Sequence, residues 1–192
     1  MAKLYFKHGT MDASKSADLL MTAHKYEQQG KKIICLRPSL DTRTEKGFIK
    51  SRALLDRHPA LCIDESFDIF SYIESYIKNL NQNLNCILID EAQFLSKLQI
   101  EQLVHIVDFL DVPIICYGLK NSYISGQLFE GSSALLYYAD SIQEIKSVCH
   151  FCDSKATMHL RIENNLPTRS SNTNTAIIIG DTKVSESYYI ST

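Results

Sequence analysis

Residues 9–16 include side chains of the types that bind phosphate. They read GTMDASKS, and the phosphate-binding loop of nucleotide-binding proteins reads G-x-x-x-x-G-K-[ST]. In such a loop the backbone N–H groups surround the phosphates, the lysine reaches the β- and γ-phosphate oxygens, and the hydroxyl ligates Mg²⁺. Lys15 and Ser16 are in place, whereas Ser14 stands where the second glycine belongs. A chance match is the alternative, so the surrounding elements have to decide.

Two adjacent carboxylates, Asp90 and Glu91, form the second candidate group and follow the apolar run CILI. A carboxylate at a strand end beside a phosphate-binding loop can support Mg²⁺ through water. Glu91 would then be free to take a proton from an attacking hydroxyl. The alternative is that both residues only cap the next helix, because acidic side chains are favoured near helix N-termini.

The elements that must position these groups alternate between strands and helices. Buried-type strands are predicted at LYFKHG, KKIICLRP, NCILID and VPIICYG, with a weaker strand at ALCI. Amphipathic helices are predicted from Lys15 to Gly30, over SFDIFSYIESYIKNL with Ser66 as N-cap, and over KLQIEQLVHIVDFLD. This order predicts an α/β fold with a parallel sheet covered on both faces. The polar segments that follow the strands should meet at one edge, where such sheets bind ligands.

Beyond about Ser141 the pattern changes to short alternating strands, at SIQEIKSV, ATMHLRIE, AIIIG and SYYIS. The segment NNLPTRSSNTNT between them is polar and contains a proline, so it is predicted to be a loop. We therefore expect an α/β domain over residues 1–140 and a small β-rich unit over residues 141–192.

Composition narrows the class of protein. With 20 basic and 22 acidic residues the net charge is -2, which gives no electrostatic footprint for nucleic acid or an anionic membrane. No apolar run approaches the roughly 18 residues of a membrane-spanning helix, and MAKLYFKHG lacks the apolar stretch of a signal peptide. We expect a cytoplasmic protein. Four cysteines lie singly in apolar runs and are expected in the core, whereas Cys149 and Cys152 form a C-H-F-C pair.

Taken in order, GTMDASKSADLL, RPSLDTR, LIDEAQFL, GLKNSYISGQLFEGS, VCHFCDSKATMHLR and ESYYIS resemble the zinc-containing cellular and bacterial thymidine kinases. The resemblance covers essentially the whole chain, and the D-E-A-Q-F, D-T-R and C-x-x-C segments make it specific. It implies a RecA-like P-loop sheet with a small lasso and zinc-type subdomain at the C-terminus. It also implies transfer of the ATP γ-phosphate to the 5′-hydroxyl of thymidine or deoxyuridine, with Mg²⁺, by a homotetramer or homodimer.

The resemblance implies site residues as well. Glu91 matches the general base, and Asp41 and Arg43 match the D-x-R pair at the phosphate-transfer site. The segment GLKNSYISGQLFEGS matches the lasso loop that closes over the base. Positions expected at ATP and Mg²⁺ are Gly9, Thr10, Met11, Asp12, Ala13, Ser14, Lys15, Ser16 and Asp90. Positions expected around the nucleoside, each also compatible with core packing, are Met11, Gln93, Phe94, Leu119, Tyr123, Phe129, Ile177, Ile178, Ile179, Gly180, Asp181 and Tyr189.

Four departures from the family pattern bear on activity. Ser14 replaces a glycine that lets the backbone approach the phosphate. Asp12 places a carboxylate in the loop, and at ~4 Å from a phosphate oxygen it would cost up to about 4 kcal/mol at an effective dielectric of 20. The usual D-F-R of the lasso is Ser122-Tyr123-Ile124 here. The sequence ends before the second C-x-x-[CH], so Cys149 and Cys152 are expected to supply half of a structural Zn²⁺ site.

These departures leave other functions open. One is a catalytically silent paralogue that binds nucleosides or regulates another protein. A generic P-loop ATPase or helicase-like module is a further alternative, because D-E-A-Q resembles a helicase box. That class needs a second motor domain and a basic surface, which this sequence lacks. The cysteine pair could also be a redox pair, although no thioredoxin-like unit surrounds it.

Overall fold

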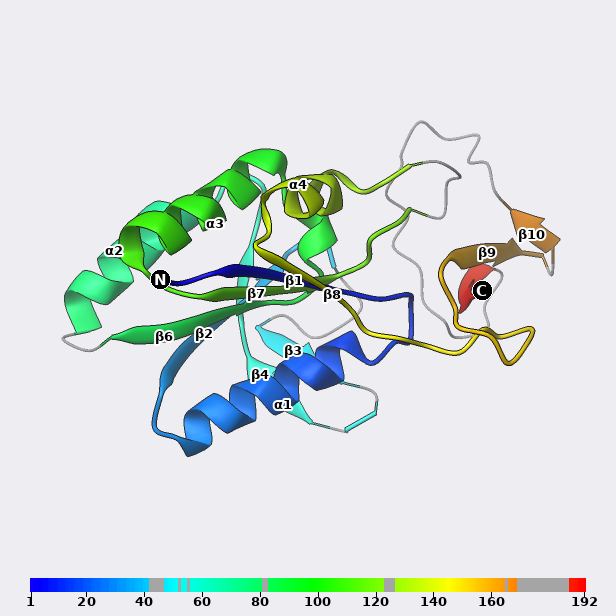
Figure 1. Cartoon of the computed structure of the whole chain (residues 1–192), viewed down its shortest axis with the longest axis horizontal. Helices are drawn as coiled ribbons and strands as arrows, with labels where there is room; N and C mark the ends of the chain where they lie inside the picture. The colour runs from blue at the N-terminus through cyan, green and yellow to red at the C-terminus, as the bar shows by residue number, and fades with distance from the viewer. Residues whose placement is uncertain are drawn as a thin grey trace.

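A six-stranded parallel sheet forms the centre of the fold, with strand order β5-β2-β6-β7-β1-β8. Figure 1 shows this computed structural model, which describes residues 1–41, 47–51, 53–54, 56–80, 83–122, 127–164, 166–168 and 187–192. The predicted parallel sheet is confirmed. Its strands are β1 (Leu4–His8), β2 (Lys32–Pro38), β5 (Leu61–Ile63), β6 (Leu84–Ile89), β7 (Ile114–Gly118) and β8 (Ser141–Glu144).

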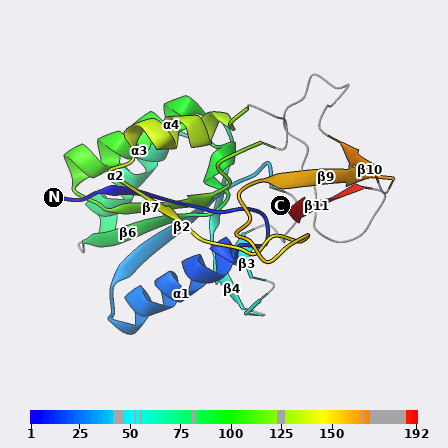
Figure 2. The same cartoon turned by 45° about the vertical axis from the view of Figure 1, so that its right-hand side comes forward.

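Helices cover both faces of the sheet (Figures 1 and 2). Helix α1 (Lys15–Gln28) lies on one face, beside an antiparallel hairpin of β3 (Phe48–Lys50) and β4 (Arg57–Pro59). Helices α2 (Ile69–Leu80), α3 (Lys97–Leu110) and α4 (Glu130–Tyr138) pack side by side on the other face. Each face has its own apolar cluster, which explains why the central strands are continuous apolar runs rather than alternating ones.

The helix ends follow from local hydrogen bonding. Gly30 has φ +68 just past α1, so the predicted end of that helix is confirmed. The predicted N-cap of α2, Ser66, is wrong. The Asp68 carboxylate accepts the Ser71 N–H at 3.0 Å and so caps the first turn. Ser66 instead donates through its N–H and its hydroxyl to Asp64, which holds it in the preceding turn.

Four elements differ from the expectations. The hairpin β3–β4 was not predicted, and α4 begins inside the segment expected to be lasso loop. Strand β8 pairs in parallel with β1, with Phe6 opposite Ile142, and so belongs to the large sheet. It can do so because the chain after α4 returns to the free edge of β1. The division of the chain at residue 140 stays a prediction.

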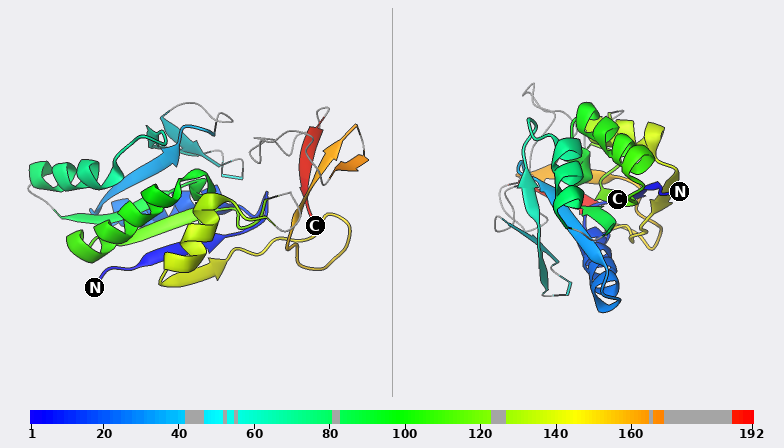
Figure 3. Two further views of the ribbon diagram at one scale, coloured as in Figure 1. Left: turned by 90° about the horizontal axis from the view of Figure 1, so that it is seen from above. Right: turned by 90° about the vertical axis from the view of Figure 1, so that its left-hand side faces the viewer.

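A small antiparallel sheet lies beyond the carboxyl ends of the large sheet's strands (Figures 1 and 3). It consists of β9 (His159–Glu163), β10 (Leu166–Thr168) and β11 (Ser187–Ser191), in the order β10-β9-β11. This sheet therefore faces the edge at which the candidate residues of the α/β part converge. Within the described ranges, none of the helices is long and apolar enough to cross a membrane.

Candidate active site

The loop formed by residues 9–16 joins β1 to α1, as predicted. Lys15 is buried, and its Nζ donates to the Thr10 carbonyl oxygen at 2.7 Å across the loop. Gly9 has to be a glycine, because an added Cβ would lie 2.6 Å from the Ile145 carbonyl oxygen and 2.8 Å from Ala13 Cβ. The loop thus folds tightly at the end of β1 and presents its lysine at the start of a helix, the arrangement of a phosphate-binding loop.

Ser14 adopts the backbone conformation that a glycine would adopt. Its φ and ψ are 58 and 28, in the left-handed region, and Asp12 has φ 60. This conformation costs roughly 1–2 kcal/mol for a residue that carries a Cβ. The loop therefore retains the glycine-type geometry although the glycine is absent, and it does so under local strain. Both Ser14 and Asp12 are exposed.

Ser16 and Asp90 meet at the edge of the sheet although 74 positions separate them. The Ser16 hydroxyl donates to the Asp90 carboxylate, with Oγ 3.0 Å from Oδ2 and 3.3 Å from Oδ1. Asp90 directly follows β6 and is buried. Burial, with the neighbouring Glu91 charge, raises the pKa of Asp90 to about 7. A cation bound beside it would favour the ionised form. The pair brings together the hydroxyl predicted to ligate Mg²⁺ and the carboxylate predicted to support the ion through water.

Glu91 lies between β6 and the short 3-10 helix η1 (Ala92–Phe94), with its backbone at φ 51. The buried Gln93 side chain donates from Nε2 to Glu91 Oε2 at 2.5 Å. Its Oε1 accepts the N–H of Leu119 at 3.0 Å. The sequence predicts a nucleoside contact for Gln93, and the structure adds these two hydrogen bonds, which no sequence pattern could reveal.

Asp41 is buried together with Arg37, which sequence reasoning missed. An Arg37 Nη atom lies 3.3 Å from an Asp41 carboxylate oxygen, and the guanidinium also donates to the Asp41 carbonyl oxygen. A second Nη donates to the Phe48 carbonyl oxygen at 2.8 Å. Arg37 thus joins the end of β2 to β3. A basic residue inside an apolar strand pattern was the available signal. Arg43, the expected partner of Asp41, lies outside the described residues.

Several of the residues expected around the nucleoside form one cluster. Met11, Leu119 and Tyr189 are buried against one another, and Phe129 packs against them. They come from the phosphate loop, the end of β7, β11 and the residue before α4. Phe94 contacts Phe129 edge to face, with ring centroids 5.8 Å apart. The other expected positions, Tyr123, Ile177, Ile178, Ile179, Gly180 and Asp181, lie outside the described residues.

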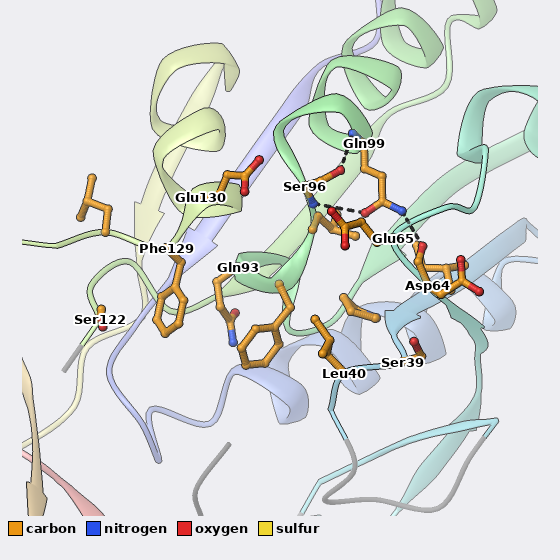
Figure 4. A pocket seen from close by; sticks show the side chains of 15 residues that line it. Ser39, Leu40, Asp64, Glu65, Gln93, Ser96, Gln99, Ser122, Phe129 and Glu130 are labelled. Atoms are coloured by element: carbon orange, nitrogen blue, oxygen red, sulfur yellow. Dashed lines mark hydrogen bonds between the residues drawn. The ribbon is translucent and has the colours of Figure 1, made fainter. Parts of the chain in front are cut away.

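A cavity of about 400 Å³ opens beside this cluster. Figure 4 shows Gln93 and Phe129 on one side of it and Ser39 and Leu40 on the other. Two acidic residues that follow β5 also line it. Sequence reasoning missed the acids Asp64 and Glu65, and also Leu40 and Ser122, as lining residues. Their position was the available signal, because each lies near the end of a predicted strand or in the expected lasso.

Cys149 and Cys152 are free thiols in the turn between β8 and β9. The Phe151 N–H donates to Cys149 Sγ at 3.4 Å, and hydrogen bonds from Ser154 lower the pKa of the exposed Cys152. In the part of the chain that the structure describes, no group of three or more His, Cys, Asp or Glu side chains is placed to hold a metal ion. Two thiols alone do not make the four-coordinate site of a structural zinc. Of the four cysteines expected in the core, Cys62 is half-buried and the others are buried.

Comparison with solved structures gives a distant likeness to the Pif1 helicase from Candida albicans, with a TM-score of 0.43 and 15% identity. The match covers 76% of this chain and 36% of that one. It does not bear on function.

Sequence relatives are much closer. A thymidine kinase of Streptococcus agalactiae serotype Ia is 49% identical over 167 residues, which is 87% of this chain and 85% of that protein. The thymidine kinase of Streptococcus gordonii is 46% identical and covers the same share of this chain and 84% of its own length. The profile of the family described as thymidine kinase matches residues 2–190. With this match over almost its entire length, the chain belongs to the thymidine kinase family.

Proposed function

We propose that this chain works as an ATP-dependent thymidine kinase at the edge of the sheet where residues 9–16, Asp90 and Glu91 meet. The reaction transfers the γ-phosphate of ATP to the 5′-hydroxyl of thymidine or deoxyuridine. The observation that carries the proposal is the contact between Ser16 Oγ and Asp90 Oδ2, 3.0 Å apart. It joins a phosphate-loop hydroxyl to a strand-end carboxylate, which is how P-loop enzymes hold their metal ion.

The phosphate loop would bind ATP through its backbone N–H groups and Lys15. The Lys15 ammonium is already held across the loop by the Thr10 carbonyl oxygen, so a small change in side-chain torsions would bring it to a phosphate oxygen. Ser16 and Asp90 would hold Mg²⁺, directly or through water. The bound ion supplies positive charge to the phosphate oxygens.

Glu91 is proposed as the general base. Its carboxylate would take the proton of the 5′-hydroxyl as the bond from O5′ to the γ-phosphorus forms and the bond to the β,γ-bridging oxygen breaks, with ADP leaving. Asp41 and Arg43 are proposed to act at the transferred phosphate. The Arg37 guanidinium would keep Asp41 in place through their ion pair.

The nucleoside is proposed to bind among the clustered residues. Met11, Leu119, Phe129 and Tyr189 offer an apolar surface to a pyrimidine ring. Phe94 extends that surface toward the cavity. Tyr123 and residues 177–181 are proposed to complete the enclosure, as in the family pattern. We also propose a cytoplasmic location and a homotetrameric or homodimeric assembly, which light scattering of the purified chain would test.

Two of the four departures behind the silent-paralogue alternative, Ser14 and Asp12, lie in the phosphate loop. Ser14 keeps the glycine-type backbone, so the cradle is retained. Asp12 is exposed, and solvent and salt screen an exposed charge. Both observations favour a working kinase with weakened ATP binding over a protein that has lost turnover.

The experiment is thymidine-dependent ADP formation with Mg²⁺, measured for the parent chain and for Glu91→Gln, Ser14→Gly and Asp12→Asn. The kinase proposal expects turnover by the parent, loss of turnover in Glu91→Gln, and a lower KM for ATP in the two loop variants. An inactive parent that gains large activity from Ser14→Gly or Asp12→Asn would support the silent paralogue instead. Thymidine omission serves as the control for plain ATP hydrolysis.

A further inference from the structure

The side chain of Glu91 needs an external partner to fix its orientation. Its terminal torsion joins sp³ to sp² carbon, and such torsions are broad. Its backbone also has φ 51, at a turn between β6 and η1. The hydrogen bond from Gln93 Nε2 to Oε2, at 2.5 Å, restricts rotation of the carboxylate.

Gln93 is itself held firmly. Only 2% of the residue is exposed, and its Oε1 accepts the Leu119 N–H at 3.0 Å. Leu119 is the first residue after β7. Both polar atoms of the Gln93 amide are therefore hydrogen-bonded, Oε1 to the backbone just beyond β7 and Nε2 to the carboxylate of Glu91.

Two glycines make room for this arrangement. A Cβ on Gly118 would lie 2.7 Å from Gln93 Oε1 and 3.1 Å from the Gln93 backbone nitrogen. A Cβ on Gly131, in the first turn of α4, would lie 2.6 Å from the carbonyl oxygens of Ala92 and Leu95. The end of β7, at Gly118, and the first turn of α4, at Gly131, thus both lie so close to η1 that neither position has room for a side chain. Both elements hold η1 in place.

We propose that Gln93 is a positioning residue for Glu91, and that Gly118 is required because it leaves space for the Gln93 amide. The inference rests on the proposed role of Glu91 as general base. A group that only orients the base acts on the rate of phosphoryl transfer. A group that contacts the nucleoside, the role implied by family resemblance, acts on nucleoside binding. The two roles therefore predict different kinetic effects. Loss of orientation lowers kcat, whereas loss of a nucleoside contact raises KM for thymidine.

The first test compares steady-state kinetics of Gln93→Met and Gln93→Glu with the parent. Gln93→Met keeps the side-chain length and removes both hydrogen bonds. Gln93→Glu keeps an acceptor for the Leu119 N–H and removes the amide donor to Glu91. We expect kcat to fall by about 10²-fold in both, the loss typical of a misplaced catalytic group, with KM for thymidine close to that of the parent. An unchanged kcat with a raised KM for thymidine would overturn the proposal.

The second test displaces the Gln93 amide by a substitution at Gly118, which lies against it, rather than at Gln93 itself. Gly118→Ala should displace Gln93 and lower kcat, again without raising KM for thymidine. Because both substitutions act through one hydrogen bond to Glu91, Gly118→Ala combined with Gln93→Met should be little worse than Gln93→Met alone. Fully additive losses of kcat would contradict the shared mechanism.

Gln102→Ala is the matched control for a structural glutamine. Gln102 Oε1 accepts the Ile69 N–H at 2.8 Å between α3 and α2, away from the site. This variant should lose stability in urea and keep the parent kcat. If its kcat falls as far as that of Gln93→Met, the effect on turnover is a general result of losing a structural glutamine hydrogen bond, and the proposal is wrong.

A crystal structure of Gln93→Met separates this inference from the proposed function, since it does not depend on turnover. A displaced Glu91 carboxylate beside an intact Ser16–Asp90 contact supports positioning even if Glu91→Gln proves that Glu91 is not the base. A Glu91 carboxylate that stays in its parental orientation overturns the positioning role, whatever the kinetics show.

Discussion

At the scale of single residues, Ser14 shows that a backbone conformation can be kept when the side chain that favours it is lost. Its φ of 58 lies where glycine is at ease and serine is not. Lys15 and Ser16 follow directly, so any shift of Ser14 would move the residues proposed to bind phosphate and metal. The strain is therefore located next to the two residues of the loop, Lys15 and Ser16, whose positions matter most for the proposed binding.

Ser14→Gly should release this strain. The expected gain of about 1–2 kcal/mol is partly offset by the entropy that glycine adds to the unfolded chain, about 0.4–1 kcal/mol. Urea unfolding should accordingly show a net gain below about 2 kcal/mol, and KM for ATP should fall. Asn164→Gly is the matched control, because Asn164 has φ 49 in the turn after β9. A fall in KM for ATP in that variant would show that relief of strain in general, rather than the loop, is responsible.

At the scale of elements, Arg37 connects three segments of chain. It lies at the end of β2, pairs with Asp41 in the following loop, and donates to the Phe48 carbonyl oxygen of β3. Both members of the pair are buried. A buried ion pair adds little net stability, but removal of one partner leaves a buried charge. Arg37 therefore holds Asp41, in the loop after β2, close to Phe48 of the hairpin.

Arg37→Met should destabilise the chain by about 3–5 kcal/mol in urea unfolding, because the buried ion pair between Arg37 and Asp41 is broken. Arg37→Met combined with Asp41→Asn should recover part of that loss, since the charge that paired with Arg37 is then removed as well. A double variant that is less stable than Arg37→Met would contradict this explanation.

Sequence reasoning predicted the central strands because burial on both faces makes them continuous apolar runs. The same logic could not find β3 and β4, which have three residues each. A strand was predicted at SIQEIKSV, but its residues in β8 are mostly exposed, so their pattern did not place it in the large sheet. The start of helix α4 was missed because its first three residues, 130–132, also belong to the segment matched to the lasso. In the site, motif spacing predicted Ser16, Asp90 and Glu91. The Gln93 amide and the Arg37 guanidinium act through side-chain contacts, which spacing does not encode.

At the scale of the whole molecule, the C-terminal sheet packs against the phosphate loop. Ser191 of β11 donates to the Met11 carbonyl oxygen, and its strand partner His159 of β9 is buried. Burial and, to a smaller extent, the positive charge of Lys15 lower the pKa of His159 to about 4. The small sheet therefore buries, beside the loop of residues 9–16, a histidine that is neutral at pH 7.

Stability should depend on pH through His159. Its pKa is about 4 in the folded chain, against an ordinary value of 6.5 for histidine, so between these values the unfolded chain binds the extra proton. Stability from this group is complete above pH 6.5 and is lost as pH falls toward 4, by up to about 3 kcal/mol. Asp90, with its raised pKa, acts in the opposite direction over the same range. His159→Gln isolates the histidine, and urea unfolding at pH 7 and pH 5 should show a smaller loss in that variant than in the parent. Equal losses would refute the assignment.

Met11 has a double position. Its side chain belongs to the apolar cluster with Leu119 and Tyr189, while its carbonyl oxygen, within the phosphate loop, is held by Ser191. A nucleoside that orders this residue lowers the entropy that remains to be lost when a phosphate chain binds, and the converse holds. Binding linkage is reciprocal. For the proposed kinase, any factor by which thymidine changes the affinity for ATP must therefore equal the factor by which ATP changes the affinity for thymidine, and Met11, which contacts both proposed binding regions, is the residue through which we expect this coupling.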